Sequence, residues 1–116
     1  MICRQEDMHF QVRPDMKGGQ GEVTVTHLAD TESLKHIRLL GELSLPKGTS
    51  IGQHPHENET EYFVIMEGTA IATDNGKEEV VNKGEVIITG SGSTHSIRNA
   101  EDTTLKVLAF IITDEE

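Results

Sequence analysis

Short stretches in which apolar and polar residues alternate run along most of this chain. Val23 and Val25 alternate with threonines, and Leu43 and Leu45 repeat the pattern further along. Because successive side chains of a strand point to opposite faces, such alternation predicts β-strands. The predicted strands span residues 22–27, 36–45, 61–66, 69–74, 77–81, 85–89, 95–99 and 104–113. The chain is therefore predicted to be all-β.

The residues between these segments predict tight turns and mostly antiparallel neighbours. Asn75-Gly76 suits the positive φ angles of a type I′ hairpin, and Gly48 and Gly84 suit strand ends. Residues 30–35 carry the one helical signal, too short for more than a connector, and residues 13–21 are predicted to form a loop. Because many short antiparallel strands must hide their edges, we expect a sandwich, a jelly roll or a small barrel.

The last predicted strand is apolar on both of its faces, and so is the strand over 61–66. One face of residues 104–113 carries Val107, Ala109 and Ile111, and the other carries Leu108, Phe110 and Ile112. In a monomer of this size one face of each strand should meet water. A second buried face therefore predicts a subunit contact, and we expect a two-fold homodimer.

Composition narrows the classes of protein to which the chain can belong. Its 116 residues suffice for one domain, and 10 Lys and Arg against 20 Asp and Glu give a net charge of −10. This acidic surplus disfavours nucleic acid and anionic membrane surfaces as partners. No apolar run approaches the roughly 20 residues that span a bilayer, and residues 1–10 carry charges where a signal peptide is apolar. We therefore expect a cytoplasmic protein.

Four side chains have the spacing of a metal site. His54 and His56 stand two residues apart, so both imidazoles project to the same face of an extended segment. A turn after them would return the chain so that Glu61 points inward, and His95 opens another strand. Because Cys3 is the only cysteine, any metal site must use nitrogen and oxygen donors. The predicted ligands are His54, His56, Glu61 and His95.

Two blocks of spaced residues resemble the two motifs of the cupin superfamily. In residues 48–68, Gly48, His54, His56, Glu61 and Gly68 occupy every fixed position of the first motif. In residues 84–99, Gly84, Gly90, Gly92, His95 and Asn99 resemble the second motif, with Gly90 replacing the usual proline. The chain is thus similar to a single-domain cupin over residues 1–116.

The resemblance implies a double-stranded β-helix jelly roll, the cupin barrel, with a divalent metal held inside it by His54, His56, Glu61 and His95. Three imidazoles and one carboxylate leave open positions on an ion that suits Mn, Fe, Ni, Co or Zn. An open position can polarise or orient a small ligand, or bind dioxygen if the ion is redox-active. Oxalate decarboxylases are the members that this chain most resembles, although Ile51 stands where they carry an arginine and they tend to have two cupin domains.

Two functions from different classes follow from this resemblance. The first is a metalloenzyme that acts on a small carboxylate or oxygen-rich substrate, of decarboxylase, dioxygenase or isomerase type. The alternative is a non-catalytic module that binds a small-molecule ligand with the help of the metal. Product formation from a panel of keto, hydroxy and dicarboxylic acids would separate them.

Other polar residues receive lesser roles. We expect Glu57 and Glu59 to be solvated loop charges, with a general base near the metal as the alternative, and Asn99 to bond to the backbone. Three histidines without ligand-type neighbours are expected to be exposed or structurally satisfied: His9, His27 and His36. Three side chains could contact a substrate carboxylate: Arg38, Arg98 and Gln53.

Overall fold

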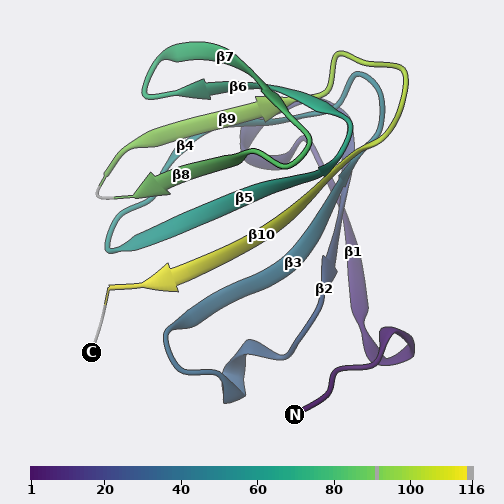
Figure 1. Ribbon diagram of the computed structural model, residues 1–116, viewed down its shortest axis with the longest axis vertical. Coiled ribbons are helices and arrows are strands. Elements are labelled where there is room, and N and C mark those ends of the chain that lie inside the picture. Colours follow the sequence, from purple (N-terminus) through teal and green to yellow (C-terminus); the bar gives the residue numbers. More distant parts are fainter. Residues whose placement is uncertain (91, 115–116) are drawn as a thin grey trace.

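The computed structural model describes residues 1–90 and 92–114, and it consists of ten strands with three short 3-10 turns (Figure 1). The strands are β1 (His9–Pro14), β2 (Glu22–His27), β3 (Ile37–Leu45), β4 (Ser50–Pro55), β5 (Glu59–Glu67), β6 (Thr69–Asp74), β7 (Lys77–Asn82), β8 (Val86–Gly90), β9 (Thr94–Arg98) and β10 (Leu105–Thr113). The 3-10 turns are η1 (Gln5–Asp7), η2 (Met16–Gly18) and η3 (Thr31–Ser33).

The strands form two antiparallel sheets that lie over each other as a jelly roll (Figure 1). The larger sheet has the order β1-β2-β3-β10-β5-β8, and the smaller has the order β4-β9-β6-β7. Consecutive strands often lie in different sheets, so the chain crosses repeatedly from one layer to the other. This topology places the end of β4 opposite the start of β5.

The apolar core fills the space between the two sheets. Alternate residues of each strand point inward, and these are the buried ones in β2, β5 and β10. The core consists of Val23, Val25, Leu43, Leu45, Ile51, Phe63, Ile65, Ala70, Ala72, Ile87, Ile97, Leu105, Val107 and Ala109. Burial of this cluster supplies the main hydrophobic stabilisation of the fold.

The eight predicted strands are confirmed, with ends that differ by at most two residues. The Asn75-Gly76 hairpin is also confirmed, because both residues have positive φ angles, 52° and 87°. Asn99 bonds to the backbone as expected, and its Nδ2 donates to the carbonyl oxygens of Leu45 and Thr103 at 2.9 and 2.7 Å. The predicted turn over residues 90–94 includes residue 91, which lies outside the described residues.

Two features of the N-terminal part were not predicted. The loop expected over residues 13–21 is only partly right, since Arg13 and Pro14 belong to β1 and a 3-10 turn follows at Met16–Gly18. Strand β1 pairs with β2 in register, with Arg13 opposite Val23 and Gln11 opposite Val25. Its inner face is therefore polar, and its apolar residues, Phe10 and Val12, lie on the exposed outer face.

Candidate metal centre

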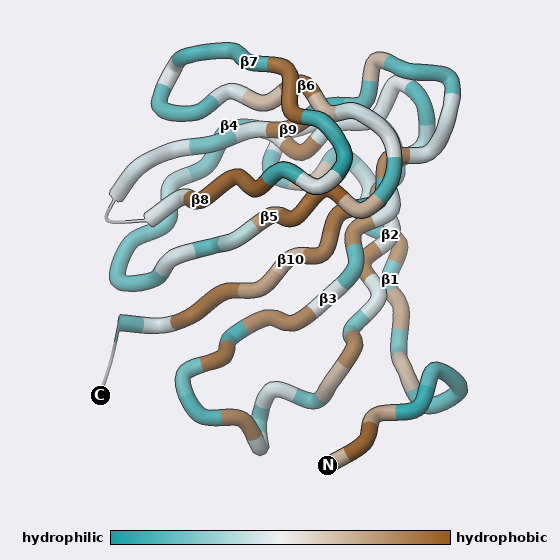
Figure 2. The backbone as a smooth tube through the Cα atoms, viewed as in Figure 1, coloured by the Kyte–Doolittle hydropathy of each residue, from teal (hydrophilic) through white to brown (hydrophobic). Residues whose placement is uncertain are grey.

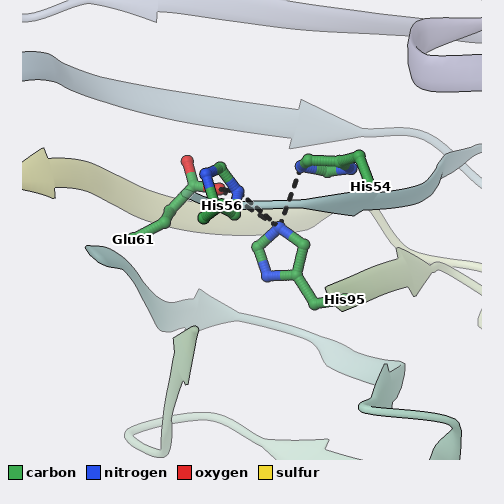
Figure 3. Close-up of side chains that lie close together, drawn as sticks. All are labelled: His54, His56, Glu61 and His95. Carbon is green, nitrogen blue, oxygen red and sulfur yellow. Dashed lines mark hydrogen bonds and ion pairs between the residues drawn. The ribbon is translucent and has the colours of Figure 1, made fainter. Parts of the chain in front are cut away.

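Both sheets contribute to a cluster of three histidines and one glutamate (Figure 3). His54 lies in β4 and pairs across the ladder with His95 of β9. His56 follows directly after β4, and Glu61 projects from β5 of the opposite sheet. The interior of the jelly roll thus collects the four residues that the motif spacing predicted.

The donor atoms of the cluster are spaced as metal ligands are. All four lie within 4.8 Å of one another. The Nε2 atom of His95 is 3.1 Å from that of His56 and 2.9 Å from that of His54. Glu61 Oε1 is 2.8 Å from His56 Nε2 and 3.2 Å from His95 Nε2. Two ligands at about 2.1 Å from one ion and at right angles to each other lie about 3.0 Å apart, so this group is able to hold a divalent metal.

The other nitrogen of every imidazole is held by the protein. His54 Nδ1 donates to the carbonyl oxygen of Gly52 at 2.7 Å, and His95 Nδ1 shares a hydrogen bond of 2.9 Å with the hydroxyl oxygen of Thr89. His56 Nδ1 donates to a carboxylate oxygen of Glu59 at 2.6 Å. With a proton on each Nδ1, the Nε2 lone pairs are free to face a common ion. Such outer partners fix the tautomer and the ring orientation of ligating histidines.

Burial and charge also shape the cluster. His56, Glu61 and His95 are 4%, 4% and 2% exposed, and the ring of Phe63 stacks on His95 with centroids 4.8 Å apart. Burial lowers the pKa of His54, which favours the neutral form that a metal requires. Burial opposes ionisation of Glu61, but hydrogen bonds from His56 and His95, when their Nε2 atoms carry protons in place of an ion, outweigh it and lower the pKa of this carboxyl group.

Glu59 has a different role from the solvated loop charge that the sequence suggested. Arg38 binds its carboxylate through Nε at 2.7 Å and Nη2 at 2.8 Å, while His56 donates to it from the other side. The hydrogen bonds from Arg38 and then from His56 outweigh burial and lower the pKa of Glu59 to about 2. Glu59 is therefore a charged outer partner of the cluster, whereas Glu57 is exposed as expected.

A cavity of about 230 Å³ opens beside the cluster and is lined by His54, His56 and Glu61. Of the three side chains considered for a substrate carboxylate, Arg38 lines this cavity. Arg98 lies in a groove on the outer side of the smaller sheet, near Glu78 at 3.7 Å. Gln53 is exposed and donates to Thr94. Arg98 and Gln53 are thus not among the residues that line the cavity.

Sequence reasoning missed two cations that line the same cavity, Arg13 of β1 and Lys17 of η2. Recognition of residues 9–13 as a strand, from the alternation of Phe10 and Val12 with polar neighbours, would have pointed Arg13 inward. His27 also lines the cavity, whereas His9 and His36 are exposed. In the described part of the chain, the clustered donors are the four predicted ones.

The family model of the cupin domain matches residues 41–111, which include both motifs and all four clustered donors. The chain belongs to the cupin family. The jelly-roll fold expected from the resemblance is confirmed by this match and by the arrangement of the sheets. No helix among residues 1–90 and 92–114 of this cupin has the length and apolar character needed to cross a membrane.

Three proteins resemble this cupin, two of them in sequence and fold and one in fold alone. It is 39% identical over 113 residues to the oxalate-binding protein of Thermotoga maritima, covering 97% of this chain and 93% of that one. The crystal structure of a predicted oxalate decarboxylase from the same species matches with a TM-score of 0.92 and 38% identity, over 97% and 99% of the two chains. The polyketide cyclase RemF of Streptomyces resistomycificus shares the fold, with a TM-score of 0.78 and 20% identity over 99% of this chain and 80% of that one.

Proposed function

We propose that this cupin is a metalloenzyme that acts on a small carboxylate or oxygen-rich substrate, by decarboxylation, oxidation or isomerisation. The observation that carries the proposal is the convergence of the Nε2 atoms of His54, His56 and His95 with Glu61 Oε1, at separations down to 2.8 Å. We assign the role of metal ligands to these four residues. The donor set suits Mn, Fe, Ni, Co or Zn.

The chain's own groups would prepare the site for a substrate. Gly52 and Glu59 accept from the Nδ1 atoms of His54 and His56 and so favour the tautomer that presents Nε2, and Thr89 orients His95. Phe63 and the core beneath it cover one side of the cluster, so a substrate enters from the cavity. A bound divalent ion would supply Lewis-acid polarisation of a substrate oxygen, or redox chemistry if the ion is Mn or Fe.

A non-catalytic role is the second candidate, and one comparison favours it. The relative with 39% identity is named an oxalate-binding protein. In that case the cluster and the cavity would capture a small anion without turnover. Both roles predict ligand binding, and they differ only in whether a product forms.

The test is to load the purified protein with Mn, Fe(II), Co, Ni or Zn in turn and to add a panel of small keto, hydroxy and dicarboxylic acids. Ligand binding is followed by calorimetry, and products are followed by NMR. Turnover that His95→Ala abolishes supports the enzyme. Binding without product with every metal supports the binding module, and the absence of metal binding would refute both.

We further propose that residues 1–116 form one cupin domain and that two copies associate through the outer face of the larger sheet. Ile88, Tyr62, Phe110 and Leu40 form a row across β8, β5, β10 and β3. Tyr62 stacks on Phe110, and Ile88 is 58% exposed. Figure 2 shows the apolar colouring of β5, β8 and β10. A contiguous apolar surface of this kind is typical of an isologous dimer contact. The cytoplasmic location stays a prediction.

A further inference from the structure

The wall of the cavity carries more positive than negative charge, although the whole chain has a net charge of −10. The cationic residues that line it are Arg13, Lys17 and Arg38, and the acidic ones are Glu59 and Glu61. A divalent ion on the cluster would add two further positive charges. A positive cleft in an acidic protein concentrates field lines and selects anions.

These three cations differ in whether a carboxylate already neutralises them. Arg38 is engaged by Glu59 in a two-point ion pair. Arg13 donates to the neutral Gln11 Oε1 at 2.8 Å. Within residues 1–90 and 92–114, neither Arg13 nor Lys17 has a carboxylate partner within 4.0 Å. Two cations at the cavity are thus available for an anionic ligand.

The segment that carries Lys17 is held firmly against β4. A Cβ atom on Gly52 would lie 2.1 Å from the carbonyl oxygen of Lys17, and one on Gly19 would lie 2.2 Å from that of Ser50. Only glycine at both positions permits this close backbone approach. Lys17 itself has a left-handed backbone with a φ of 55°, which costs a non-glycine residue about 1 kcal/mol or more. The packing against β4 therefore determines where Lys17 lies.

The size of the cavity limits the ligand. A water molecule occupies about 30 Å³ of the liquid, so about 230 Å³ corresponds to roughly seven or eight non-hydrogen atoms. This space suits a short-chain organic acid. Residues of the metal cluster and both of these cations line this one cavity.

We propose that Arg13 and Lys17 form a second anion subsite, which binds one carboxylate of a short dicarboxylic acid while the other end of the acid faces the metal cluster. The subsite rests on the proposed function, since the cluster provides the first point of attachment. It uses residues that precede both motifs. Arg13 and Lys17 would set the preference for a second carboxylate and would take no part in holding the metal.

The experiment compares binding of oxalate, malonate, succinate and acetate to the Zn-loaded protein by calorimetry. For the wild type, we expect at least one of the three diacids to bind more tightly than acetate. In Arg13→Gln/Lys17→Gln, we expect the affinity for that diacid to fall at least tenfold, which corresponds to about 1.4 kcal/mol, while the affinities for acetate and Zn²⁺ stay the same. The matched control is Lys83→Gln/Arg98→Gln, which removes two positive charges at exposed positions away from the cavity.

A single substitution protects the test against a variant that fails to fold. Lys17 is exposed, so Lys17→Glu should fold and should weaken the same diacid at least as strongly as loss of the lysine charge alone. Equal diacid binding by the wild type and by both cavity variants would overturn the subsite but leave the proposed function intact. A wild type that binds Zn²⁺ but none of the diacids would also overturn the subsite, whereas a wild type that binds no metal would overturn the proposed function.

Discussion

Replacement of Glu59 by glutamine should weaken metal binding and lower the stability of the metal-free protein. The two oxygens of Glu59 accept three hydrogen bonds, two from Arg38 and one from His56. Glutamine keeps the shape but turns an NH2 group toward one of these donors. Where the NH2 group faces His56, that ring loses its hydrogen-bond acceptor, and in either orientation Arg38 loses its charged partner. Loss of such an outer partner typically costs 10- to 100-fold in metal affinity.

The effect on stability follows from the pKa of Glu59. Arg38 and His56 lower this pKa from 4.5 to about 2. At 1.36 kcal/mol per pKa unit, the ionised carboxylate contributes at most about 3 kcal/mol. Because Arg38 is 55% exposed and solvent screens its charge, we expect about 1 to 2 kcal/mol at pH 7.

The lowered pKa of Glu59 fixes the direction in which stability depends on pH. A pKa that is lower in the folded state stabilises the protein above the unfolded value of 4.5, and the contribution is lost as the pH falls from there toward 2. The stability difference between wild type and Glu59→Gln should therefore shrink by roughly half or more between pH 7 and pH 3.

The assay is urea unfolding of both proteins with chelator at the two pH values, together with a Zn²⁺ titration at pH 7. Glu57→Gln is the matched control, because Glu57 is an exposed acid two residues before Glu59. A Glu59→Gln variant that equals the control in metal affinity, or whose stability deficit is the same at pH 7 and pH 3, would refute the reasoning.

Three further predictions concern the cluster and the outer surface. His95→Ala should lower metal affinity about 100-fold or more, whereas His36→Ala, at an exposed position, should leave it unchanged. Equal losses of metal affinity in titrations of the two variants would mean that the ligands are misassigned. Metal affinity should fall with decreasing pH, beginning above pH 6.5, because the hydrogen bond to Glu61 raises the pKa of His56 and a proton then competes with the metal. Metal retention that is unchanged at pH 5 would contradict this. Ile88→Glu should convert the proposed dimer to a monomer in light scattering, and an unchanged mass would exclude this face as the contact.

Sequence patterns predicted the strands whose inward side chains are apolar. They did not identify β1, whose inward Arg13 lines the cavity. Phe63 and Ile65 point inward with Glu61 because all three share one face of β5, and spacing alone reveals that face. In β1 the inward positions hold Gln11 and Arg13, and the apolar Phe10 and Val12 lie on the exposed outer face.

The four clustered donors were predictable because their spacing is set by the strands that carry them. The partners of those donors were not predictable. Thr89 meets His95 and Arg38 meets Glu59 only after the chain has crossed between sheets. The close approach of the Lys17 backbone to Gly52 likewise depends on how the segment after β1 folds back onto β4, and no local pattern encodes that contact.

Because the donors come from different sheets, metal binding should affect the stability of the protein and its resistance to proteases. Glu61 belongs to the larger sheet, whereas His54 and His95 belong to the smaller one. An ion bound by all of them would link the two sheets. It would bind the folded chain and not the unfolded one. At free metal 100-fold above the dissociation constant, this linkage adds about 2.7 kcal/mol. Starvation for the metal should then shorten the lifetime of the protein against proteases, so that its abundance follows the supply of the ion.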